Sequence, residues 1–282
     1  MDTSSVVPSR QTRMTVWLAL LLVAALAWAI VVQQNRTMFD VGVNQSAPDM
    51  SGMGSGMSDM SSMNSGSASI PADPTSIWLY LPLWTSMMVA MMFPAVAPVV
   101  SLFVTISQNR RAANQRAAPT WIFLAGYLAV WSLLGVAAYL LSRVLPALGM
   151  MATGLRVEYP VAAGLVLIFA GLYQFSPLKR VCLRHCRSPL SVILHGWHDG
   201  NAGSFRMGFE HGAYCLGCCW GLMLVLFVVG MMNLVGMVIL SAIIFIEKVV
   251  PYGQTIGKLT ALGLIIMGLI TLAMPILRQA AG

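Results

Sequence analysis

Apolar runs long enough to cross a bilayer recur along the whole chain, and they constrain the fold more than any other feature. A helix needs about 20 apolar residues to span the hydrocarbon. Such runs lie at residues 14–32, 77–107, 120–142, 159–176, 212–231, 233–250 and 256–277. With 58% hydrophobic and only 9% charged residues, the chain lacks the composition of a soluble domain. We therefore expect an all-α, polytopic transmembrane helical bundle of about seven spans.

These runs divide the chain into three parts. Residues 1–32 are expected to form an N-terminal membrane anchor, residues 33–76 an extracytoplasmic loop rich in Met, Ser and Gly, and residues 77–282 a multi-helix membrane domain. A cleaved signal peptide is the alternative for the first run, because two arginines precede it and Ala-Leu-Ala at 25–27 resembles a cleavage site. The apolar run is long for a signal peptide, which favours an uncleaved anchor.

The positive charges predict how the spans are oriented. The net charge of +7 comes from residues between the apolar runs, so it reports topology and does not indicate nucleic-acid binding. If the N-terminus is cytoplasmic, twelve of the sixteen Lys and Arg residues fall on the cytoplasmic side. This distribution follows the positive-inside rule and predicts a multi-pass membrane protein with its N-terminus in the cytoplasm.

Residues 182–219 contain every cysteine and every histidine of the chain. His211, Cys215, Cys218 and Cys219 fall within a 100° arc of one helix face at 100° per residue. We expect them at the cytoplasmic start of the span 212–231, directly after a basic loop at 177–206 that carries further ligand-type side chains, namely Cys182, His185, Cys186, His195 and His198.

Three interpretations of this cluster stay open at this point. Cysteines in membrane helices often serve only as small packing residues. Thiolates also act as soft metal ligands and as redox nucleophiles, and nearby Arg and Lys lower their pKa. Cys215 and Cys218 have Cys-x-x-Cys spacing, but they lie in an apolar helix where a substrate disulfide is difficult to reach.

Methionines favour copper among the possible metals. The expected outer loop contains Met50, Met53, Met57, Met60 and Met63 among Ser, Gly and Asp residues. Such a composition is typical of a flexible linker, yet a linker has no need for an oxidisable apolar side chain. Thioethers bind Cu(I) and do not favour zinc, so this segment predicts copper capture outside the membrane.

A second methionine group lies within an expected span. Met87 and Met91, and likewise Met88 and Met92, are one helical turn apart. Methionine is also a common core filler, which is the alternative. The spacing resembles the Met-x-x-x-Met of eukaryotic copper importers and predicts a soft-ligand route from the outer loop towards the cysteines.

Several ordered motifs resemble one bacterial family. They are WTSMMVAMMFPAVAP at 84–98, YQFSPLKRVCLRHCRSP at 173–189, GFEHGAYCLGCCWGLM at 208–223 and EKVVP at 247–251. The chain resembles, over roughly 78–277, predicted metal-binding integral membrane proteins that include a membrane copper chaperone required by a bacterial tyrosinase. The resemblance implies copper delivery to a partner enzyme. By position it implies roles for all five cysteines, Cys182, Cys186, Cys215, Cys218 and Cys219, with the methionines of the second span.

The sequence thus predicts a membrane copper-handling protein, either a Cu(I) chaperone or a transporter, which is not itself an enzyme. Its expected partners are the lipid bilayer and a copper-dependent enzyme or copper carrier. The chain carries no phosphate-binding Gly-rich motif that would indicate ATP-driven pumping. A membrane thiol-disulfide oxidoreductase that uses the same cysteines is the rival. Lys248 is expected to reach the membrane interface, and Glu247 to pair with it or with Lys258.

Overall fold

The computed structural model describes residues 9–45, 76–114, 119–147, 159–188, 197–230 and 233–281. Within these residues every regular element is an α-helix, which confirms the all-α class. The helices are α1 (Arg10–Gln45), α2 (Ser76–Ala112), α3 (Thr120–Ala147), α4 (Tyr159–Gln174), α5 (Pro177–Arg187), α7 (Gly200–Val229), α8 (Leu234–Val249) and α9 (Gly253–Ala281).

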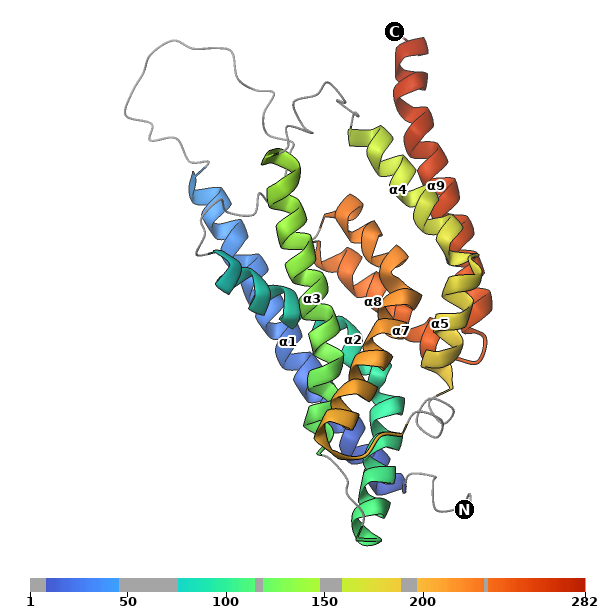
Figure 1. Ribbon diagram of the computed structural model, residues 1–282. Helices are drawn as coiled ribbons and strands as arrows, with labels where there is room; N and C mark the ends of the chain where they lie inside the picture. Colours follow the sequence, from blue (N-terminus) through green and yellow to red (C-terminus); the bar gives the residue numbers. More distant parts are fainter. Residues whose placement is uncertain are drawn as a thin grey trace.

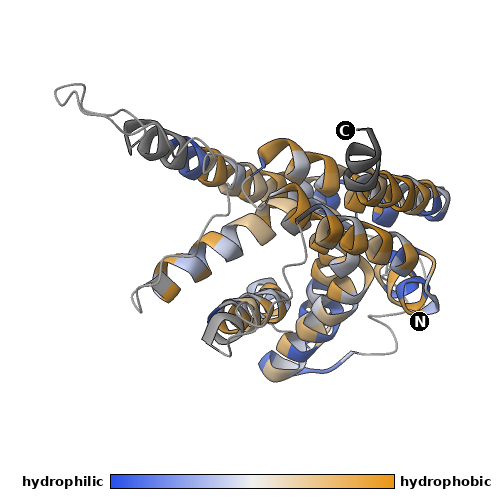
Figure 2. Cartoon of the chain, turned by 90° about the horizontal axis from the view of Figure 1, so that it is seen from above, coloured by the Kyte–Doolittle hydropathy of each residue, from blue (hydrophilic) through white to orange (hydrophobic). Residues whose placement is uncertain are grey.

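Most of these helices have the length and composition of membrane spans. Five of them qualify on their own, namely α1, α2, α3, α7 and α9, and α4 with α5 makes a sixth if this pair, bent by 61°, is one span. Helix α8 has 16 residues and is about 24 Å long at the usual helical rise, which is shorter than the hydrocarbon core. The expected count of about seven is therefore refined to five or six long spans in the described residues. Figure 2 shows that most of the helical ribbon is apolar.

Helix α2 lies at the centre of the bundle, and α1 and α9 lie at its edges. The apolar window of α2 is 78% buried, against 22% for those of α1 and α9. Helix α1 packs on α2, α3 on α7, and α4 on α9, while α8 contacts α2, α7 and α9 (Figure 1). The outer faces of α1 and α9 expose leucines and isoleucines, as expected where the neighbour is lipid.

Helix α2 changes direction along its length (Figure 1). It contains Pro82, Pro94 and Pro98, and each proline lacks the N–H that would continue the helical hydrogen-bond ladder. Three prolines in one helix therefore account for its change of direction. The bend lies within the helix whose methionines face the middle of the bundle.

Helices α3 and α7 touch backbone to backbone. A Cβ atom added at Gly208 would overlap the carbonyl of Phe123, and one added at Gly126 would overlap the carbonyl of Phe205. Small residues at such positions let membrane helices approach closely. This contact fixes α7 on α3 next to the cysteine-bearing part of α7.

Two expected boundaries in the cysteine region are wrong. Residues 177–187 form helix α5 instead of a loop, with the Ser176 hydroxyl accepting a hydrogen bond from the Lys179 amide at 3.1 Å and Pro177 in the first turn. Helix α7 begins at Gly200, about a dozen residues before the predicted span. Hydropathy marks the apolar part of a helix, and the polar first turns of α7 extend beyond it. The cysteines of α7 therefore lie in the middle of a helix and not at its start.

Candidate metal centre

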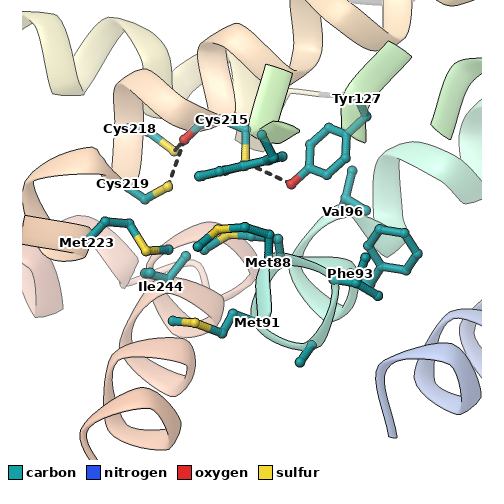
Figure 3. Packing of buried hydrophobic residues seen from close by; sticks show 14 of the residues in the cluster. Met88, Met91, Phe93, Val96, Tyr127, Cys215, Cys218, Cys219, Met223 and Ile244 are labelled. Atoms are coloured by element: carbon teal, nitrogen blue, oxygen red, sulfur yellow. Dashed lines mark hydrogen bonds between the residues drawn. The ribbon is translucent and has the colours of Figure 1, made fainter. Parts of the chain in front are cut away.

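Three thiols from α7 form the base of the site. Cys215, Cys218 and Cys219 are buried, with at most 2% of each residue exposed. The thiols of Cys218 and Cys219 both donate to the carbonyl of Cys215, each at 3.0 Å (Figure 3). The expected common face of this helix is thus turned into the protein.

Helix α5 adds a fourth sulfur from the other side. The Sγ atoms of Cys186 and Cys218 are 3.8 Å apart. Two sulfurs that bind one metal at about 2.3 Å lie no more than about 4.6 Å apart, so this pair is close enough to share an ion. Cys182, one turn earlier on α5, lies with its sulfur against Gly217 of α7. The ring of His185 stacks on Tyr214 at 4.1 Å, which also holds α5 on α7.

Cys215 contacts two polar groups from other helices. The Lys248 ammonium on α8 donates to the Cys215 sulfur at 2.9 Å, and the hydroxyl of Tyr127 on α3 lies 3.1 Å from the same sulfur. Lys248 is only 8% exposed, so the expectation that it extends to the membrane interface is wrong. The thiol offers the ammonium a partner inside the bundle, and a buried cation requires one.

A buried ion pair lies on the same side of the bundle. The Lys179 ammonium on α5 donates to the Glu247 carboxylate on α8 at 2.7 Å, with both side chains 3% exposed. The partner of Glu247 is therefore Lys179. The expectation that Glu247 pairs with Lys248 or with Lys258 is wrong. Arg187 at the end of α5 donates to the carbonyls of Val250 and Pro251 at 2.8 Å each. Both contacts attach α5 to α8.

His211 lies one helical turn before Cys215 and is 2% exposed. Its ring packs against Phe123 and Tyr127, with ring centroids 6.2 and 6.0 Å away. Within the described residues its Nδ1 atom has no hydrogen-bond partner. His211 is thus joined to Cys215 through Tyr127, whose ring contacts the histidine and whose hydroxyl contacts the sulfur.

The methionines of α2 face the same interior. Figure 3 shows Met88 and Met91 of α2 and Met223 of α7 with their sulfurs on the side of Cys219. Met88, Met91 and Met92 are no more than 1% exposed. Met87 lines an apolar cavity of about 260 Å³ together with Met88 and Met223. The loop methionines Met50, Met53, Met57, Met60 and Met63 lie outside the described residues.

The arrangement offers several sulfur ligands from different helices. Among the residues that the structure describes, no three His, Cys, Asp or Glu side chains are arranged to hold a metal ion together. Cys186 and Cys218, from two different helices, have their sulfurs 3.8 Å apart. The thioethers near Cys219 extend the sulfur-rich region towards α2 (Figure 3). Chemically, such a region suits a soft ion that binds few ligands.

Sequence reasoning missed three members of this region. Met223 lies one turn after Cys219 on α7, and that spacing was a usable signal. A lysine inside an apolar run, as at 248, is itself a sign of a functional partner within a membrane. Tyr127 carried no signal, because its contact with Cys215 depends on how α3 packs on α7.

A comparison with family models places most of the chain in a known group of sequences. The model of the family PpoB2, described as copper chaperone, matches residues 81–271. The matched segment contains all five cysteines, the methionines of α2, His211 and Lys248. No curated protein and no solved structure matches the chain.

Proposed function

This chain belongs to the PpoB2 copper chaperone family, and from that premise we propose that it binds Cu(I) through thiols of α5 and α7 and delivers the ion to a copper-dependent protein. The observation that carries the proposal is the 3.8 Å separation of the Cys186 and Cys218 sulfurs on two different helices. Thiolates and thioethers select Cu(I) over harder ions. Zinc prefers four ligands in a closed structural site, and among the described residues no three His, Cys, Asp or Glu side chains are grouped to hold one ion.

The other sulfurs would guide the ion to and from this pair. We assign the binding pair to Cys186 and Cys218. Cys182, Cys215, Cys219 and His211 would be transient ligands that the ion meets on its way to and from this pair. The methionines of α2, Met87, Met88, Met91 and Met92, would form an uncharged path along which Cu(I) moves between weak sites. In this proposal the segment with Met50, Met53, Met57, Met60 and Met63 captures copper outside the membrane, because several weak sites on one tether raise the local ion concentration.

The apolar helices are compatible with membrane insertion, and we assign the protein to a bacterial inner membrane with its N-terminus in the cytoplasm. The partner would then be a copper enzyme or a copper carrier that meets the protein at the membrane. The charge distribution between the apolar runs supports this orientation.

The proposal is tested by metal binding to the purified protein. We expect Cu(I) to bind more tightly than Zn(II), measured by competition with chelators of known affinity, and the bound copper to show sulfur-dominated X-ray absorption. Stoichiometric zinc without copper, after expression with both metals in excess, would contradict the proposal.

A thiol-disulfide oxidoreductase is the second candidate, favoured by the same close pair of thiols. Two thiols at 3.8 Å need only a small movement to form a bond. For this function, metal-free protein would have to exchange disulfides with a substrate and lose two free thiols on oxidation. Thiol titration before and after incubation with oxidised and reduced model disulfides separates the candidates, because a copper chaperone needs no such turnover.

A further inference from the structure

We propose that Lys248 is a fixed counter-ion that matches the sulfur site to a monovalent metal ion bound by two thiolates. This inference rests on the proposed copper function and names the residue that sets its ion specificity. Lys248 does not ligate the metal in this proposal, because an ammonium has no lone pair to offer. Its role is to balance the negative charge of the complex that the metal ion forms with two thiolates.

The charges buried around the site do not cancel. Lys179 and Glu247 pair with each other at 2.7 Å, so together they contribute no net charge. Lys248 contributes one further positive charge, and its ammonium lies 2.9 Å from the Cys215 sulfur. It also lies close enough to Cys186, Cys218 and Cys219 to act on them electrostatically. A neutral Cys215 thiol accepts a hydrogen bond from this ammonium but carries no charge to balance it. An unbalanced charge in such surroundings is costly, so the site favours an occupant that carries one negative charge.

A Cu(I) ion bound by two thiolates has this charge. Each thiol loses one proton on binding, and the two thiolates and the monovalent cation sum to one negative charge. Lys248 then neutralises the complex. A divalent ion on the same two thiolates would be neutral and would leave the ammonium unbalanced. Cu(I) on three thiolates would carry two negative charges and exceed the single available cation.

The position of Lys248 fits this role. It comes from α8, whereas the close thiols come from α5 and α7, so it can balance the complex without belonging to either ligand-bearing helix. Its contact with Cys215 lies one turn from Cys218 on the same face of α7. Charge complementarity over such short distances is strong in an interior from which water is excluded.

The test compares variants of the full-length protein in detergent. Lys248→Gln keeps a hydrogen-bond donor for Cys215 but removes the charge, and Lys248→Arg keeps the charge. We expect Lys248→Gln to lower Cu(I) affinity by about 10- to 100-fold, as for other residues that support metal ligands. Its Zn(II) affinity should change less, so the preference for Cu(I) falls. Lys248→Arg should retain most of that preference.

A matched control removes charges without changing their sum. The double variant Lys179→Met with Glu247→Gln replaces the neutral ion pair by neutral side chains, and its Cu(I) preference should stay close to that of the wild type. A monodisperse Lys248→Gln protein that keeps wild-type Cu(I) affinity and preference would overturn the inference.

A measurement on the wild type keeps the inference testable if Lys248→Gln does not fold. X-ray absorption of the copper-loaded wild type should show two sulfur ligands, and three would contradict the charge match. If the wild type binds no Cu(I) at all, the proposed function itself fails. If it binds Cu(I) and the Lys248→Gln variant is unaffected, only the role of the counter-ion fails.

Discussion

The two faces of α7 are built in opposite ways. Near its start, α7 meets α3 through glycines and backbone, with Gly208 and Gly126 each against a carbonyl of the other helix. Towards α5 and α8 it consists of thiols and a buried ammonium, including the Cys186–Cys218 and Lys248–Cys215 contacts. The first face leaves no room for a side chain, and the second gathers groups that are costly to bury without partners.

The two kinds of contact serve different purposes, one in packing the helices and the other in binding. Close backbone packing supplies the van der Waals contact that holds membrane helices together. Thiols and a lysine are not needed for that purpose, because apolar side chains of similar size would pack as well. The glycine face should therefore govern whether the bundle forms, and the sulfur face what it binds.

The stability of the protein should be more sensitive to substitutions on the glycine face than to substitutions on the sulfur face. Gly208→Ala puts a methyl group onto the Phe123 carbonyl, and we expect it to destabilise the protein by about 3 kcal/mol or more. Thermal unfolding of purified protein and the yield of monodisperse protein measure the effect. Gly263→Ala on α9 is the control, because a Cβ there meets no atom within 4 Å. Equal behaviour of the two variants would contradict the assignment of the α3–α7 contact as the framework.

Changes to the thiols on the sulfur face should weaken metal binding and leave the fold intact. Replacing Cys186 and Cys218 by Ser together should lower Cu(I) affinity by about 100-fold or more, because hydroxyls are poor ligands for soft ions. We expect the helix content and size-exclusion profile to remain those of the wild type. Cys182→Ser on the same helix should have a smaller effect, since its sulfur lies against Gly217 and is not one of the two sulfurs at 3.8 Å. An equal loss in both variants would move the site towards Cys182.

The methionines of α2 should give the smallest effect. Met88→Leu with Met91→Leu removes two buried thioethers while nearly conserving volume, so the change in stability should stay below about 1.5 kcal/mol. We expect a several-fold slower transfer of Cu(I) from the protein to a chelator, followed by stopped-flow absorbance. Met267→Leu on the exposed face of α9 is the matched control. Unchanged transfer in the double variant would assign Met88 and Met91 to packing alone.

Much of the fold was predictable from the sequence because apolar runs mark membrane helices directly. The three prolines of α2 also made its bend predictable. The shared face of Cys215, Cys218 and Cys219 followed from helical spacing, and their common burial agrees with it. Helix α5 was predictable too, because a serine before a proline is a typical helix start, but its high charge led to the expectation of a loop.

The pairing of the two cysteine groups was not predictable in this way. The contact between Cys186 and Cys218 depends on the 61° bend between α4 and α5 and on how α5 lies across α7. Neither follows from local spacing, since both are set by tertiary packing. The same holds for Lys248, whose position depends on α8 being held near α7.

The bend before α5 also bears on how quickly a bound ion would leave. Helix α5 carries one sulfur of the close pair, whereas α7, which carries the other, is fixed on α3. A rotation of α5 about the bend would separate Cys186 from Cys218 while leaving both helices intact. The residence time of the ion would then be set by the contacts that hold α5 down, such as Arg187 on the carbonyls of Val250 and Pro251. A recipient protein that competes for those contacts would shorten the residence time without competing for the metal itself.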